Sequence, residues 1–203
     1  MLLVLVCITV FSATILASVY ALTKEPIEQA KTAKQQNAIN EVLPPYHRLA
    51  DAEVVEVEGS DMVVYRAYDE QGNVVGGAVE AVSKNGFSGE IKIMVGFDAD
   101  ANIVDYSVLE QKETPGLGTK MTDWFKTDKG QQSIKGKNPA SDDLRVTKDG
   151  GDIDAITAAT ISSRAFLEAV RCAYAAYGGT DINQTDANSG ATDTTDADSG
   201  ATY

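Results

Sequence analysis

The chain opens with an unbroken apolar run and reaches alternating apolar and polar positions only farther on. No charged residue occurs over positions 2–22, and a helix of that length measures about 31 Å, which matches the hydrocarbon core of a bilayer. A cleaved signal peptide has a shorter apolar region behind a basic stretch, and Val19-Tyr20-Ala21 is a poor cleavage site. The pattern therefore predicts an uncleaved transmembrane helix over residues 1–22.

Polar residues enter directly after the apolar run, mixed with apolar residues at helical spacing. Thr23 is the expected N-cap of a second helix, with Glu25-Pro26 in its first turn. Pro44-Pro45 is expected to end this helix. The pattern predicts a helical stalk over residues 23–45.

The charges near the span support two orientations. Lys24, Lys31, Lys34 and Arg48 all follow the span, so the positive-inside rule places the rest of the chain in the cytoplasm. A start codon assigned too far downstream would have removed a basic leader, and the apolar run does begin directly after Met1. Charge alone leaves the orientation open.

Strict alternation of apolar and polar residues begins near residue 53 and predicts an antiparallel sheet with one covered face. Helical spacing then returns over 119–129 and, more clearly, over 161–177, where Gly178-Gly179 forms a stop. Two helices packed on such a sheet make an α+β domain, expected over 46–178. The expected strands are 53–57, 62–67, 74–81, 91–95 and 103–109.

Composition limits the chemistry that this domain can perform. The net charge of −13 disfavours a nucleic-acid partner. Two cysteines, Cys7 and Cys172, are too few for a four-thiolate metal site, and the single His47 is too little for a histidine-rich centre. No metal site and no catalytic acid–base or nucleophilic set is expected, so redox chemistry would require an organic cofactor.

Two segments of the body carry a chemical signal. Glu113-Thr114-Pro115-Gly116-Leu117-Gly118 combines a fixed proline dihedral with glycines that allow close backbone approach. Asp154-Ala155-Ile156-Thr157-Ala158-Ala159-Thr160 runs into the 161–177 helix, whose first N–H groups form a ready anion site. Taken alone, each segment is better explained structurally, as a Pro-Gly turn and as a Thr N-cap.

Together, the two segments resemble the FMN-binding subunits of membrane ion-pumping redox complexes. The resemblance is strongest to the G subunit of the Rnf complex and weaker to the C subunit of the sodium-pumping NADH:quinone reductase. It includes the uncharged span, Thr23-Lys24-Glu25-Pro26-Ile27 and Gly86-Phe87-Ser88-Gly89, and it covers the chain nearly to Gly178. It implies a membrane-anchored subunit that relays electrons in an Rnf-type ferredoxin:NAD oxidoreductase coupled to ion translocation.

The resemblance also implies how the cofactor is held. In that family a flavin transferase outside the cytoplasm joins FMN, through its phosphate, to the last Thr of a Ser/Thr-Gly-Ala-Thr motif. The matching residue is Thr160, and the phosphodiester is expected to lie over the N–H groups of Ile161, Ser162 and Ser163. The flavin domain would then face the extracytoplasmic side of the inner (cytoplasmic) membrane, with the lipid bilayer and other membrane subunits as partners.

The family's usual glycine in this motif is replaced by Ala158. If that position has a positive φ, an alanine there is strained by about 1–3 kcal/mol. Besides the attachment at Thr160, the resemblance implies FMN contacts from Glu113, Thr114, Leu117, Gly118, Asp154, Thr157, Ala158, Ala159, Ile161 and Ser162.

The last 25 residues have a different composition from the body. Residues 179–203 contain five Asp and no Lys or Arg, and such a tract is predicted to be a disordered acidic tail. It contains Asp-x-x-Ser-Gly-Ala-Thr twice, ending at Thr192 and Thr202. We interpret both copies as coincidences of low complexity, because no apolar helix follows either one; additional flavin attachment is the alternative.

Two other functional hypotheses stay open at this point. The C subunit of the quinone reductase would perform the same chemistry in a different complex. A noncatalytic, membrane-anchored binding module without flavin would use Thr160 only as a helix cap. Flavin would be bound in either of the two redox subunits but not in the binding module, so its presence distinguishes these hypotheses.

Overall fold

The computed structural model describes residues 1–178, and the predicted tail at 179–203 lies outside the described residues. The chain divides into two compact units, residues 1–37 and the residues from 38 onward.

Apart from Met1, the first unit lies within α1 (Leu2–Val42), a helix that continues through Pro26. An 18-residue window of α1 has a mean hydropathy of 2.6 and none of it is buried, so the helix is apolar and long enough to cross a membrane. The predicted N-cap at Thr23 is wrong, because this residue lies inside the helix. Its hydroxyl donates to the Val19 carbonyl oxygen at 2.8 Å, a back-bond that lets threonine stay helical. The division into a span at 1–22 and a stalk at 23–45 stays a prediction.

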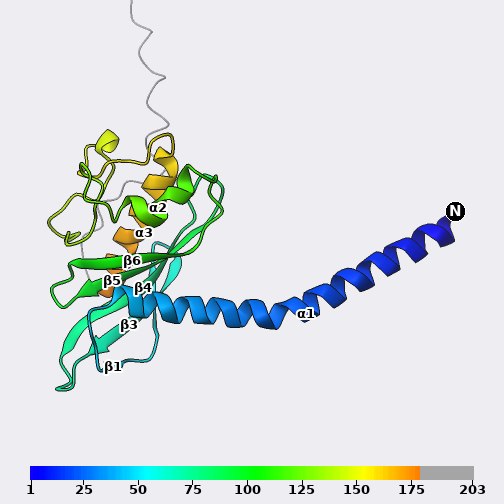
Figure 1. Ribbon diagram of the computed structural model, residues 1–203, viewed down its shortest axis with the longest axis horizontal. Helices are drawn as coiled ribbons and strands as arrows, with labels where there is room; N and C mark the ends of the chain where they lie inside the picture. Colours follow the sequence, from blue (N-terminus) through cyan, green and yellow to red (C-terminus); the bar gives the residue numbers. More distant parts are fainter. Residues whose placement is uncertain (179–203) are drawn as a thin grey trace, which may run out of the picture. The chain divides into compact units, whose positions relative to one another are not determined.

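The second unit is built on one antiparallel sheet (Figure 1). The predicted strands are confirmed with small extensions, and the pairing order is β1-β3-β4-β5-β6, with β2 also paired to β3. The sequence pattern missed β1, which is only two residues long and follows the Pro44-Pro45 pair. The strands are β1 (Arg48–Leu49), β2 (Glu53–Val57), β3 (Ser60–Tyr68), β4 (Val74–Ser83), β5 (Ile91–Asp98) and β6 (Ile103–Glu110).

Helix α3 (Thr160–Tyr177) contacts strands β2, β3, β4 and β5, and its buried face is part of the main hydrophobic core. The fully buried Phe166 ring stacks on Phe125, with centroids 4.5 Å apart, and meets Tyr106 edge to face at 4.8 Å. Such aromatic pairs stabilise a core beyond the apolar area they bury. The expected α+β class, an antiparallel sheet packed with helices, is confirmed.

The helix predicted over 119–129 is much shorter in the structure. A 3-10 turn, η1 (Gly118–Lys120), leads into α2 (Met121–Trp124), and the chain then leaves the helix. The reason is that the buried Phe125 gives its carbonyl oxygen to the N–H of Ile134, at 3.0 Å, instead of to a following turn. Phe125 thereby anchors the long loop that returns to α3.

A second apolar cluster joins the end of α1 to the sheet. It contains Ala38, Ile39, Val42 and Leu43 together with Ala67, Ala78, Met94 and Leu109. A Cβ atom on Gly96 would overlap the Val42 carbonyl, so only glycine at this place in β5 lets the helix end come so close. Residues 38–43, within the segment predicted as a stalk, therefore belong to the compact unit that carries the site.

Candidate functional site

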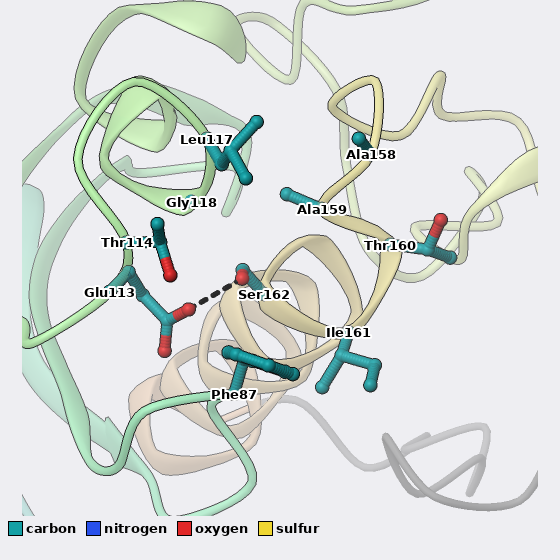
Figure 2. A pocket seen from close by; sticks show the side chains of 10 residues that line it. All are labelled: Phe87, Glu113, Thr114, Leu117, Gly118, Ala158, Ala159, Thr160, Ile161 and Ser162. Carbon is teal, nitrogen blue, oxygen red and sulfur yellow. Dashed lines mark hydrogen bonds between the residues drawn. The ribbon is translucent and has the colours of Figure 1, made fainter.

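A cavity of about 360 Å³ lies between the start of α3 and two loops of the second unit (Figure 2). One loop contains Phe87 and precedes β5, and the other runs from the end of β6 into η1. Nine of the eleven residues predicted to bind FMN line this cavity, although they come from segments far apart in the chain. The lining residues are Phe87, Glu113, Thr114, Leu117, Gly118, Ala158, Ala159, Thr160, Ile161 and Ser162.

Glu113 ties the three segments around the cavity together. Its side chain is 4% exposed, and its carboxylate accepts hydrogen bonds from the Ser162 hydroxyl at 2.6 Å and from the Ser88 N–H at 3.0 Å. Figure 2 shows the first of these bonds, which links the 113–118 loop to α3. A buried carboxylate needs such donors. Glu113 is thus a structural bridge as well as part of the cavity wall.

Gly118 makes room for this bridge. A Cβ atom there would lie 2.7 Å from the Ser162 hydroxyl oxygen and 2.7 Å from the Glu113 Cβ. Both distances are far below van der Waals contact, and both neighbours are buried. The absence of a side chain at Gly118 therefore permits the loop to close on α3.

The N-terminus of α3 presents free hydrogen-bond donors to the cavity. The N-cap position is Ala159, with no side-chain cap, and Thr160 is the first helical residue. The Thr160, Ile161 and Ser162 N–H groups have no acceptor among the described residues, whereas the Ser163 N–H donates to the Ala159 carbonyl at 3.0 Å. The expectation that Ser163 would offer its N–H to a phosphate is therefore wrong, because that group is the first to enter the helical ladder. Because the N-cap is Ala159, the Thr160 hydroxyl does not cap the helix.

Ala158 has a φ of +62°, in the left-handed region. The alanine that replaces the family's usual glycine is therefore strained. For a residue with a Cβ atom, this conformation costs about 1–2 kcal/mol of conformational free energy. The strained alanine directly precedes the N-cap of α3, so it sets the direction from which the chain enters the helix.

We predict that Ala158→Gly raises the free energy of unfolding by about 0.5–1 kcal/mol, because relief of the strain outweighs the greater entropy of the unfolded chain. Urea unfolding of the purified protein measures this change. Ala140→Gly is the matched control, since Ala140 is exposed and does not have a positive φ. The control should lose stability, and a loss of similar size in Ala158→Gly would contradict the strain.

Two of the predicted residues do not line the cavity. Asp154 joins the segment before α3 to the loop after α2: its carboxylate accepts from the Gln131 N–H at 3.0 Å, and its carbonyl accepts from the Trp124 indole N–H at 2.9 Å. Thr157 is exposed. Asp154 is therefore placed to hold the segment that delivers Thr160 to the helix start.

Sequence reasoning did not assign two residues that the structure brings to the site. Phe87, 66% exposed, lines the cavity from the loop before β5; the Gly86-Phe87-Ser88-Gly89 string was the available signal. Lys148 places its Nζ 3.3 Å from the Thr160 hydroxyl oxygen, and no spacing rule connects it to the motif.

The two ends of the site differ in chemistry. At the helix start, free N–H groups, the Thr160 hydroxyl and the Lys148 ammonium favour an anion. The rim is apolar, with Phe87, Leu117 and Ile161 exposed by 66%, 38% and 37%. This combination suits a ligand that joins an anionic group to a flat, largely apolar ring, and FMN is such a ligand.

Comparison with known families agrees with this geometry. Residues 86–175 match the FMN-binding domain family, a range that contains all three segments around the cavity. The class of protein is therefore one with an FMN-binding domain. Residues 3–42 match a second family, the RnfG N-terminal region.

Whole-chain relatives identify the particular family. The chain is 34% identical over 182 residues to the G subunit of the ion-translocating oxidoreductase complex of Vibrio atlanticus, covering 83% of this chain and 85% of the relative. The corresponding G subunits of Aliivibrio fischeri (strain MJ11) and Methanosarcina acetivorans are 35% and 32% identical, with 83% of this chain and 85% and 88% of those relatives covered. The chain belongs to the G-subunit family of ion-translocating oxidoreductase complexes, which confirms the resemblance drawn from its motifs.

Proposed function

We propose that this protein is the single-pass, membrane-anchored flavoprotein subunit of an Rnf-type ferredoxin:NAD oxidoreductase coupled to ion translocation, and that FMN is bound covalently to Thr160. The observation that carries this proposal is that Thr160 is the first residue of α3, lines a cavity with an apolar rim and has its hydroxyl beside the Lys148 ammonium group. Its partners would be the other membrane subunits of the complex and a flavin transferase that matures it.

The attachment is a phosphoryl transfer that needs no oxidant or reductant. Thr160 Oγ1 would attack the flavin-side phosphorus of a flavin dinucleotide, forming a new O–P bond. The P–O bond of the pyrophosphate bridge breaks, the nucleoside monophosphate leaves with its electron pair, and the hydroxyl proton passes to a base of the transferase. The product is a phosphodiester that gains the mass of FMN less one water.

The chain's own residues would then position the flavin. The Thr160, Ile161 and Ser162 N–H groups lie where they can donate to phosphate oxygens, with the positive end of the α3 dipole behind them. Burial of the exposed Phe87 and Leu117 side chains against the ring would contribute roughly 25 cal/mol per Å² of apolar area.

FMN supplies one-electron and two-electron redox chemistry when bound. A thiol route is disfavoured, because burial raises the pKa of Cys172 to about 12 and keeps the group protonated at neutral pH. The protein is thus proposed as an electron relay, with substrate chemistry left to partner subunits.

The proposed attachment outside the cytoplasm predicts a topology. Alkaline phosphatase fused after Gly178, in a chain expressed from its native start codon, should be active, because this enzyme matures only outside the cytoplasm. A β-galactosidase fusion at the same residue is the reciprocal control and should be inactive. The opposite pair of results would place the domain in the cytoplasm and exclude the proposed maturation route.

Visible absorption tests the proposed function against its rivals. Protein purified from cells that contain a flavin transferase should absorb at about 450 nm and keep this chromophore after denaturation and gel filtration. A colourless protein would favour the noncatalytic binding module. Co-purification with the components of a quinone reductase would favour the alternative assignment as its C subunit.

A further inference from the structure

Lys148 is a cationic residue within hydrogen-bonding distance of the proposed attachment point. It belongs to the 3-10 turn η2 (Thr147–Asp149), and its Nζ donates to Thr160 Oγ1 at 3.3 Å. No carboxylate of the described residues lies within 4.0 Å of this ammonium group. Lys148 thus differs from the lysines that form surface ion pairs, such as Lys92 and Lys135.

The neighbouring residue fixes the turn that carries Lys148. Arg164 donates from Nε to Asp149 at 2.7 Å and from a terminal nitrogen to the other carboxylate oxygen at 2.5 Å. Both side chains are largely buried, at 18% and 17% exposed, and the hydrogen bond to Asp149 raises the pKa of Arg164. Arg164 follows Thr160 by four residues on α3, so both lie on one face of the helix. The ion pair therefore holds η2 against the first turn of α3.

The backbone holds the same turn from its other side. The Thr147 N–H donates to the Ile153 carbonyl at 2.9 Å, and Val146 and Ile153 form a parallel bridge with both side chains buried. Gly150, with a φ of +83°, closes the turn. A lysine on a surface turn usually has a mobile attachment point, whereas the main chain of Lys148 is fixed at both ends.

We propose that Lys148 is the phosphate-binding cation of the flavin attachment site. It would stabilise the negative charge that develops on the phosphoryl oxygens when Thr160 attacks, and it would afterwards pair with the phosphodiester beside the helix N–H groups. The Asp149–Arg164 pair acts as its positioning element. A cation on a held turn matters here because the chain as a whole carries a net charge of −13 and repels anions. This inference rests on the proposed attachment at Thr160.

The test is a time course of flavin attachment to the full-length protein in detergent, with purified flavin transferase and flavin adenine dinucleotide. Attachment is measured by in-gel fluorescence and intact mass. With this protein as the saturating substrate, Lys148→Gln should lower the kcat of the flavin transferase by about tenfold. Lys148→Arg should restore most of that kcat. Lys129→Gln, which removes another exposed lysine, is the matched control and should react at the wild-type rate. Arg164→Gln should fall between wild type and Lys148→Gln.

Salt dependence separates a phosphate contact from a structural effect. Added salt should slow flavin attachment to the wild-type protein more than attachment to Lys148→Gln. The reason is that salt screens the attraction between the Lys148 ammonium and the phosphate, which the variant lacks. Equal kcat and equal salt dependence in the two proteins would overturn the role of Lys148. A change confined to KM would assign Lys148 to transferase docking and would overturn it as well. If the wild-type protein accepts no flavin, the proposed function itself fails, which is a distinguishable result.

Discussion

Thr160→Ala is expected to abolish covalent flavin incorporation. Thr160 offers a hydroxyl at the first position of α3, beside three free N–H groups and on the wall of the cavity. No other hydroxyl among the described residues combines these features, since Ser162 gives its hydroxyl to Glu113 and Thr157 is exposed outside the cavity lining. The variant, produced with the flavin transferase, should show no ultraviolet-excited fluorescence in a denaturing gel.

Two further variants make this result specific. Thr160→Ser keeps a hydroxyl at the same place and should retain part of the fluorescence. A chain ending after Gly179 removes both Ser-Gly-Ala-Thr copies and should fluoresce like the full-length protein. Fluorescence in Thr160→Ala together with its loss on truncation would show that Thr192 or Thr202 carries the flavin.

Gly118→Ala is expected to disrupt the cavity and lower the free energy of unfolding by about 1–3 kcal/mol, as overpacking of a closed site does. The added Cβ would collide with the buried Glu113 and Ser162 and would separate the two side chains that join the loop to α3. The displaced loop should also shift the visible spectrum of the bound flavin. Urea unfolding and absorption spectroscopy measure the two effects.

Gly116→Ala is the matched control for this variant. Its φ is +76°, so alanine costs about 1–2 kcal/mol in conformation, but no atom lies within 4 Å of the added Cβ. We expect a loss of stability with an unchanged flavin spectrum. Identical spectra in wild type and Gly118→Ala would mean that the loop does not contact the ring.

The sequence predicted those parts of the fold whose signal is local. Period-two alternation located every long strand, and the apolar stripe of α3 located that helix within one residue. The length of the helix predicted over 119–129 was overestimated, because a tertiary hydrogen bond from the Ile134 N–H to the Phe125 carbonyl ends the helix early. The N-cap at Thr23 failed for a similar reason: a favourable capping residue does not break a helix that can continue through it.

Site residues that lie in recognisable motifs could be predicted from the sequence. Contacts that form only through tertiary packing could not. Glu113 and Thr160 lie in strings that resemble a known family, so their meeting at one cavity could be expected. Lys148 meets Thr160 through the tertiary packing of the turn that carries it, including the Asp149–Arg164 pair, and no local sequence pattern encodes this packing. The strain at Ala158 could be stated only as a condition until its φ was known.

The most direct measurement of the central claim is the mass of the peptide that carries the flavin. Trypsin cleavage after Lys148 and Arg164 releases residues 149–164, and the absence of Lys and Arg after Arg171 leaves residues 172–203 as one separate peptide. The mass of FMN less one water should appear on peptide 149–164, and fragmentation should assign it to Thr160. The same mass on peptide 172–203, or on neither peptide in protein made with an active transferase, would contradict the account.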